Sequence, residues 1–466
     1  MKNESDQRYK WRAMLVVSIG IFMATLDSSI VNIALPTLSS YFNTDIATIE
    51  WVILSYLLTI TTLLLTMGRL SDIYGRKPMF LAGLLIFTLG SGLCSLSTSA
   101  GQLIAFRVVQ GLGAAMIMAN SPAIITDVFP DTERGKAMGL VGTVVSIGSV
   151  TGPVLGGFLI DWIGWQSIFY INIPVGLLGT VYAFKTLKPE QLHDGQKFDV
   201  LGAILMFVCL ISLVLAITQG PVLGWDSPAI ISLTILFVVF LAGFVIVEKR
   251  ADQPMVELSL FSNRPFSASN ASGFLSFVAM FAVIFLMPFY MKEILGYSPR
   301  YMGMAFIAVP LVMALVAPVS GWISDRTNSF LLSSLGMGVT CMALFLLANL
   351  DQDATFIDIV VRMGMIGLGM GLFQSPNNSI IMGSVPKNRL GIAGGILGMI
   401  RNLGMVTGIA ISGAVFTSGL HSNQAGGLTY ESAFIGGFHD AFIMAAIICS
   451  VGVITSLMRG KRGKIN

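Results

Sequence analysis

The sequence predicts an all-α polytopic membrane protein with fourteen membrane-spanning helices. Of its 466 residues, 55% are hydrophobic and only 11% are charged, and the mean hydropathy is +0.81. A soluble domain of this length has far more polar surface, so these values exclude a soluble fold. The sequence also lacks the short segments of alternating hydrophobicity that form a transmembrane β-barrel.

Each span is predicted from an apolar segment, because a helix needs about 20 such residues to cross the hydrocarbon core of a bilayer. The segments lie near residues 14–36, 51–70, 79–98, 103–126, 136–159, 166–186, 200–218, 229–247, 266–290, 301–323, 330–349, 356–382, 391–418 and 438–458. The first is too long, and at Asp27 too polar, for a cleavable signal peptide, so it counts as a span.

Lysine and arginine residues predict the orientation of these spans. With fourteen spans, 22 of the 27 basic residues fall in the termini and loops on one side of the membrane. By the positive-inside rule that side is cytoplasmic, so we expect a cell-membrane protein with both termini in the cytoplasm. Because the membrane topology explains where these basic residues lie, the net charge of +3 does not indicate nucleic-acid binding.

An internal repeat divides the chain into two related halves. "GKAMGLVGTVVSIGSVTG" from Gly135 matches "GIAGGILGMIRNLGMVTG" from Gly391, and the spans before each stretch match as well. The sequence therefore predicts six-helix bundles over residues 1–199 and 249–466, with residues 200–248 as a two-helix insert. Parallel repeats of six spans are typical of secondary transporters that bind substrate between the halves near the midplane.

The insert is nearly free of polar groups within its two predicted spans. These spans contain no Lys, Arg, Asp or Glu, and their few polar residues include Ser212, Ser232 and Thr234. Such helices cannot line a hydrated cavity, so we expect them to lie against lipid beside the bundles.

Asp27 is an acidic residue in the first span, roughly 20 Å from its cytoplasmic end. The repeat aligns it with Ala279, so the second half does not need a carboxylate there. Burial favours the neutral form of a carboxyl group and contact with water favours the charged form. Such a group can take a proton on one side of the membrane and release it on the other. The alternative is a purely structural aspartate.

Two polar residues of the fourth span, Arg107 and Gln110, lie nearly on one helix face. An arginine within a span must find an anion, water or carbonyl groups, which makes Arg107 a candidate for the same coupling function. Alternatively, its long side chain extends to the outer interface.

The stretch "GRLSDIYGRKPMF" predicts a charged cytoplasmic loop after the second span. Its candidate residues are Gly68, Asp72, Gly75, Arg76 and Lys77. The two glycines permit tight turns. We expect Asp72 to face the amino end of the thirteenth span, near Gly391 to Gly395, and Arg76 to pair with Asp127. These contacts would gate the inward mouth; alternatively, the charges only anchor the loop.

The fifth span repeats small residues one turn apart, at Gly148, Gly152 and Gly156, with Pro153 among them. Small residues let helices approach closely, and proline bends a helix. The span is therefore predicted to seal the two bundles against leakage; ordinary helix packing is the alternative.

Polar residues within the spans of both halves predict a hydrated substrate cavity. They are Asn32, Gln110, Asn120, Gln374, Asn377, Asn378, Arg401 and Asn402. The second half shows no acid deep in a predicted span, because Asp358 lies near the outer end of the twelfth. This absence makes a preference for cations doubtful.

Enzymatic chemistry is not expected. The sequence has no nucleophile elbow, P-loop or HExxH motif, and its four Cys and three His residues are dispersed without metal-ligand spacing. We therefore expect no metal and no cofactor.

Five motifs, in order along nearly the whole chain, resemble those of the fourteen-span drug:proton antiporters of the major facilitator superfamily. They are "LDSSIVNIALP" from Leu26, "GRLSDIYGRKPMF" from Gly68, "LIAFRVVQGLGAA" from Leu103, "GSVTGPVLGGFL" from Gly148 and "WQSIFYINIPVG" from Trp165. One departure is Ile73, where the family usually has Arg or Lys, which weakens one expected ion pair.

The resemblance implies the major facilitator fold, with two six-helix bundles plus two extra transmembrane helices. It also implies a proton-coupled exporter of amphipathic small molecules such as drugs, by alternating access, with Asp27 in proton coupling. The expected partners are a small-molecule or lipid substrate and membrane lipids, the proton is the coupling ion, and nothing requires more than a monomer. The alternative is a lipid flippase or a proton-coupled exporter of an anionic or neutral metabolite.

Overall fold

The computed structural model describes residues 2–130, 133–188, 199–250, 257–326, 329–386 and 390–458. No β-strand occurs among these residues. Fourteen of their helices are long and apolar enough to cross a membrane. The predicted all-α polytopic fold is therefore confirmed.

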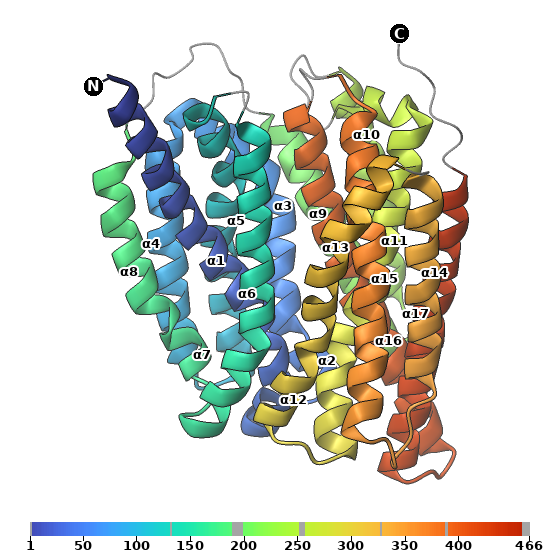
Figure 1. Ribbon diagram of the computed structural model, residues 1–466. Helices are drawn as coiled ribbons and strands as arrows, with labels where there is room; N and C mark the ends of the chain where they lie inside the picture. The colour runs from blue at the N-terminus through green and yellow to red at the C-terminus, as the bar shows by residue number, and fades with distance from the viewer. Residues whose placement is uncertain are drawn as a thin grey trace. The chain divides into compact units, whose positions relative to one another are not determined.

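Unit 1 is the first of two compact units and comprises Met1–Ala203 and Ser298–Gly303 (Figure 1). Its helices are α1 (Lys2–Phe42), α2 (Ile46–Ile49), α3 (Trp51–Tyr74), α4 (Arg76–Ser95), α5 (Ala100–Val128), α6 (Arg134–Trp162), α7 (Ser167–Tyr170) and α8 (Asn172–Thr186). The first helix packs against α5, α6 and α8, while α5 also packs against α3 and α4.

Unit 2 comprises Ile204–Tyr297 and Met304–Asn466. The remaining helices are α9 (Val200–Leu223), α10 (Pro228–Arg250), η1 (Leu258–Ser262), α11 (Arg264–Phe289), η2 (Tyr290–Ile294), α12 (Pro299–Phe306), α13 (Ala308–Arg326), α14 (Ser329–Ala348), α15 (Phe356–Gly383), α16 (Leu390–Ala425) and α17 (Tyr430–Leu457). Most of α12 belongs to unit 1, and α9 begins just before the boundary.

The helix pairs of unit 2 repeat those of unit 1. Helix α11 packs against α15, α16 and α17, as α1 packs against α5, α6 and α8. Likewise α15 packs against α13 and α14, as α5 packs against α3 and α4. The repeat in the sequence is therefore a repeat of six-helix bundles.

Polar residues just outside the spans determine where several helices begin. The Ser99 side chain accepts a hydrogen bond from the Gln102 backbone at the start of α5, and Thr355 and Asp358 form a capping box at the start of α15. Thr429 caps α17 in the same way, accepting from the Ser432 backbone. This cap makes α17 begin at Tyr430, well before the apolar segment predicted from residue 438.

Of the two insert helices, α10 is less buried than any bundle span, whereas α9 is buried as much as several of them. Only 11% of the apolar stretch of α10 is buried, and 39% in α9, against 72% in the span that contains α11. The surface of α10 is therefore available to lipid, as its composition predicts.

Candidate functional site

A buried cluster of polar side chains lies inside unit 1 and joins four helices. Asp27 of α1 and Arg107 of α5 are both fully buried, and Arg107 Nη1 lies 2.5 Å from Asp27 Oδ2. Gln110 Nε2 and Asn172 Nδ2 donate to Asp27 Oδ1 over 2.7 and 3.0 Å. Both amides also donate to Ser91 Oγ of α4, over 2.6 and 3.3 Å. We call these five residues the Asp27 cluster.

Arg107 has further partners besides the carboxylate. Its Nε donates to the Val52 carbonyl oxygen over 3.0 Å, and its Nη1 also donates to Gln110 Oε1 over 2.6 Å. The guanidinium carbon lies 3.9 Å from the centre of the Tyr56 ring, a cation–π contact. Arg107 therefore points into the bundle, and the alternative that it extends to the outer interface is wrong.

Close packing of the backbones fixes the geometry of the cluster. A Cβ atom at Gly90 would lie 2.7 Å from the Gln110 backbone nitrogen, so only glycine allows α4 to approach α5 at this point. The Tyr56 hydroxyl donates to the Ala24 carbonyl oxygen of α1 over 3.2 Å. Helices α1, α3, α4 and α5 are thus held together around the ion pair.

The glycine face of α6 packs directly on α1. A Cβ at Gly152 would lie 3.0 Å from the Ile30 backbone nitrogen, and one at Gly156 would lie 2.6 Å from an Ile30 side-chain carbon. At Gly148, the backbone carbonyl accepts a hydrogen bond from Ser29 Oγ over 3.2 Å. These contacts join α6 to the part of α1 that carries Asp27. The predicted seal between the two bundles stays a prediction.

Pro153, which the sequence places in the same motif, lies within α6. Its carbonyl oxygen would lie 2.4 Å from a Cβ at Gly303, and the Pro299 carbonyl would lie 2.5 Å from a Cβ at Gly157. Glycines on both sides therefore allow the first turns of α12 to contact α6 within unit 1.

The loop between α3 and α4 contains the turn that the sequence predicts at one of its two glycines. Gly75 has φ +94°, a conformation that favours glycine. Gly68 lies inside α3 with an ordinary helical backbone, so the turn expected there is wrong. A helix interior tolerates a glycine in this position, where the nearest atom to a Cβ would be Ala119 Cβ at 3.9 Å.

Ion pairs tie this loop to the end of α5. Arg76 pairs with Asp127, as the sequence predicts, and also donates to the Ala123 carbonyl oxygen over 3.1 Å. The Arg76 Nη2 atom lies 3.6 Å from Asp72 Oδ1. Lys77 Nζ donates to the Phe184 carbonyl oxygen of α8 over 3.0 Å. The expected contact between Asp72 and the thirteenth span stays a prediction.

Of the three candidate cavity residues in unit 1, two keep an unpaired oxygen. Asn32 and Asn120 are buried and donate to carbonyls of their own helices, Ser28 over 3.1 Å and Met116 over 2.6 Å. Their Oδ1 atoms have no hydrogen-bond partner among the described residues. Gln110 instead lies fully buried in the Asp27 cluster, so its assignment to the wall of an open cavity is corrected.

The unit 2 candidates lie on α15 and α16, both of which pack against α11. Asn377 and Asn402 are buried, Gln374 and Arg401 are half-buried, and Asn378 is exposed. Ser272 of α11 donates to Asn377 Oδ1 over 3.5 Å. Arg401 Nε is buried without a partner in the described part of the chain. That these residues line one cavity stays a prediction.

The sequence reasoning missed three residues of interest. Asn172 lies in the quoted stretch "WQSIFYINIPVG", but nothing local indicates that it binds Asp27. Ser91 gives no signal, because serine is common in spans. Asp440 lies in the third turn of α17 and is exposed, so the expectation that the second half has no acid deep in a span stays a prediction.

Comparisons with known proteins place the chain among transporters. The family model described as "Major Facilitator Superfamily" matches residues 17–409. Solved structures with this fold include a bacterial homologue of the human lysosomal transporter Spinster, inward-facing and occupied (TM-score 0.72, 14% identity, 97% of both chains). The transporter PepTSo of the POT family is also similar (TM-score 0.70, 14% identity, 96% of this chain and 99% of that chain).

Relatives of higher identity are drug and vitamin transporters. The riboflavin transporter RibZ of Clostridioides difficile is 34% identical over 97% of both chains. The multidrug resistance protein Stp of Mycobacterium tuberculosis is 32% identical over 87% of this chain and 76% of its own. The multidrug transporter MdtP of Bacillus subtilis is 31% identical over 90% and 78%, respectively. The chain therefore belongs to the major facilitator superfamily, as a multi-pass membrane transporter of small molecules and not an enzyme.

Proposed function

We propose that the protein is a proton-coupled exporter of amphipathic small molecules such as drugs, working by alternating access. The observation that carries this proposal is the Asp27–Arg107 pair, fully buried within membrane spans. Charged groups are costly at such positions and usually serve transport. The multidrug relatives support the class of substrate.

Asp27 takes a proton from outside and releases it inside in this mechanism. A protonated Asp27 no longer balances the charge of Arg107, whose Nη1 and Nε still donate to Gln110 Oε1 and the Val52 carbonyl oxygen. The arginine therefore keeps partners in both protonation states. Proton binding and substrate binding favour different conformations and so compete.

The glycine face of α6 transmits the change at Asp27. Backbone contact at Gly152 and Gly156 leaves no room for α1 to slide without moving α6. A shift of α1 on protonation is thereby passed to a second helix of the bundle, as alternating access requires.

The orientation follows from the distribution of basic residues. The protein lies in the cell membrane with both termini in the cytoplasm. The Asp72–Arg76–Asp127 contacts then lie at the inward mouth and favour its closure. The transporter works as a monomer, with the proton as its coupling ion and without a cofactor.

Asp72→Asn is expected to increase labelling of a single cysteine placed at Asn378 by a water-soluble maleimide added from the inside. The amide removes one charge of the inward closure, whereas an ion pair near the surface, such as this partly exposed one, contributes only about 0–1 kcal/mol to folding. Thermal stability should therefore change little while accessibility rises, and Asp72→Glu serves as the control. Equal labelling of the Asp72→Asn variant and the wild type would limit the loop to anchoring the helices.

A second candidate is the export of an anionic or neutral metabolite such as a flavin. The riboflavin transporter relative favours it, as does Arg401, which is half-buried and has no carboxylate partner among the described residues. An unpaired cation within a span suits an anionic substrate.

The experiment that tests the proposal is a flux screen in proteoliposomes with an imposed pH gradient. Ethidium, riboflavin and a fluorescent phospholipid represent drug, metabolite and lipid substrates. We expect gradient-driven accumulation of ethidium that stops when a protonophore collapses the gradient. Accumulation of riboflavin alone selects the second candidate, and lipid transfer independent of the gradient rules out proton-coupled export.

A further inference from the structure

Two of the four cysteines, which lie far apart in the sequence, meet inside unit 2. Cys341 belongs to α14 and Cys449 to α17, and both are free thiols. Cys341 Sγ donates to the carbonyl oxygen of Ala446, one turn before Cys449, over 3.4 Å. Cys449 Sγ donates to the carbonyl oxygen of Met337, one turn before Cys341, also over 3.4 Å. Each thiol therefore points at the helix that carries the other, and the two side chains also interact with each other.

Close antiparallel packing of α14 on α17 holds the two thiols in this position. The hydroxyl oxygens of Ser334 and Ser456 lie 2.7 Å apart one step along the same interface. Between them and the thiols, a Cβ at Gly452 would lie 3.0 Å from Met337 Sδ. Small residues let the two backbones approach each other closely. A disulfide requires side chains that face each other from closely packed backbones, and this interface supplies such a pair.

The two thiols differ in their access to lipid. Cys449 is fully buried, whereas Cys341 is half-buried. Cys341 lies about 18 Å along α14 from its first residue, within the predicted span, and its neighbour Met342 is 57% exposed. Apart from the adjoining backbone of α14, no atom of the described residues lies within 4 Å of a Cβ at Gly338, one turn before Cys341. A molecule dissolved in the bilayer can therefore reach Cys341 but not Cys449.

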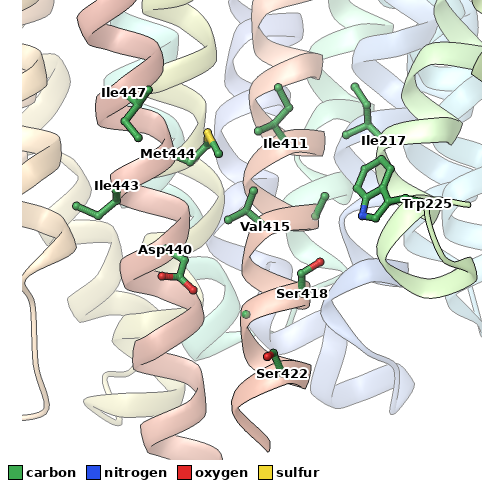
Figure 2. Close-up of a pocket in the computed structure, with 12 residues that line it drawn as sticks. Ile217, Trp225, Ile411, Val415, Ser418, Ser422, Asp440, Ile443, Met444 and Ile447 are labelled. Carbon is green, nitrogen blue, oxygen red and sulfur yellow. The ribbon is translucent and has the colours of Figure 1, made fainter. Parts of the chain in front are cut away.

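Two cavities of unit 2 lie elsewhere. The larger, of about 680 Å³, is bordered by Met444 and Ile447 of α17, Val415 of α16 and Ile217 of α9 (Figure 2). The smaller, of about 520 Å³, lies near the start of α17, where Ser432 borders it. No cysteine is among the described residues that line either cavity. Access to the thiol pair is therefore from the lipid side and not through these cavities.

We propose that Cys341 and Cys449 form a redox-active pair, which an organic hydroperoxide dissolved in the bilayer oxidises to an intramolecular disulfide. Cys341 reacts first, because it is the accessible thiol. Its sulfur attacks the terminal oxygen of the hydroperoxide, so that an S–O bond forms, the O–O bond breaks, and an alcohol leaves with the thiol proton. The Cys449 sulfur then attacks the sulfenic acid at Cys341, so that an S–S bond forms, the S–O bond breaks, and water leaves with the second proton. Two thiols and one hydroperoxide thus give one disulfide, one alcohol and one water.

A neighbouring hydroxyl group supports the first step. Ser450 Oγ lies 3.1 Å from Cys341 Sγ and 2.9 Å from the Ala446 carbonyl oxygen. Rotation of the hydroxyl group lets it donate to the sulfur as the S–H bond breaks, which stabilises the thiolate, the form that acts as nucleophile. The Asp27 cluster belongs to unit 1 and contributes no group to this chemistry. The proposal is therefore independent of the proposed proton coupling.

The test exposes the full chain to a phosphatidylcholine hydroperoxide in nanodiscs, with the corresponding hydroxy lipid as the blank. N-Ethylmaleimide then blocks the remaining thiols, and mass spectrometry identifies the linked peptides. We expect the wild type to lose two of its four free thiols, with Cys341 and Cys449 joined, and dithiothreitol should restore both. Cys209→Ser, a matched change at a buried thiol of α9, should form the same disulfide.

Two further variants separate the two steps. In Cys449→Ser the sulfenic acid at Cys341 should accumulate and form an adduct with dimedone, whereas Cys341→Ser should give no adduct at Cys449. Size-exclusion chromatography confirms that each variant is folded. Four free thiols in the treated wild type, or a link to another cysteine or another chain, overturn the proposal without reference to any variant. Faster oxidation by an equal amount of hydrogen peroxide in the aqueous phase overturns the assignment to an oxidant dissolved in the bilayer.

Discussion

Asp27→Asn abolishes pH-driven accumulation of substrate in proteoliposomes, down to the level of protein-free liposomes, if Asp27 carries the coupled proton. The amide has nearly the shape of the carboxyl group, but it cannot ionise. Downhill exchange of substrate across the membrane should persist, because the substrate cavity is unchanged. Parallel measurements of gradient-driven uptake and of exchange at equal pH separate the two activities.

The controls for this variant address its folding. Removing one partner of a buried ion pair costs about 3–5 kcal/mol when the other partner stays unpaired. Arg107 retains Gln110 Oε1, the Val52 carbonyl and the Tyr56 ring, so we expect a folded protein with a lower unfolding temperature. Asp161→Asn makes the same chemical change at an exposed residue of α6 and should transport normally. Full accumulation by Asp27→Asn would remove Asp27 from the coupling mechanism.

Gly152→Ala should strongly destabilise the packing of α6 on α1. The added Cβ would lie 1.9 Å from Ser29 Oγ and 3.0 Å from the Ile30 backbone nitrogen. The serine side chain can rotate, but the backbone can only shift. Overpacking of this kind costs about 1–3 kcal/mol, so we expect a lower midpoint of thermal unfolding and reduced transport.

Gly142→Ala provides the matched control on the same helix. Apart from the adjoining backbone of α6, no atom of the described residues lies within 4 Å of a Cβ at Gly142, and alanine favours a helix by about 1 kcal/mol relative to glycine. This variant should be as stable as the wild type or slightly more stable. Equal midpoints for Gly142→Ala and Gly152→Ala would contradict the close contact between α1 and α6.

The sequence predicts much of the fold because membrane helices have a strong local signal. Apolar segments mark all fourteen spans, and the repeat predicts that the helices of the two halves pair in the same way. Helix ends are less predictable, since they depend on caps: Thr429 extends α17 beyond its apolar segment. Asp440, the third residue of the predicted span, therefore lies in the third turn of the actual helix.

The candidate site is only partly predictable. Arg76 and Asp127 end neighbouring predicted spans, so their pairing could be inferred from topology alone. The ion pair between Asp27 and Arg107 joins two spans that are far apart in the sequence. Its formation depends on how deep each residue lies in the membrane and on how each helix is rotated about its axis, and hydrophobic periodicity does not determine either. The sequence also does not show which glycine forms a turn, because Gly75 does so whereas Gly68 continues a helix.

Proton release on substrate binding tests the central claim most directly. The measurement uses purified protein in weakly buffered detergent solution with a pH-sensitive dye, and adds the substrate that the flux screen identifies. Competition at Asp27 predicts that the wild type releases protons on binding, whereas Asp27→Asn binds the same substrate and releases none. Equal proton release by the two proteins, or binding to the wild type without release, would contradict proton-coupled export through Asp27.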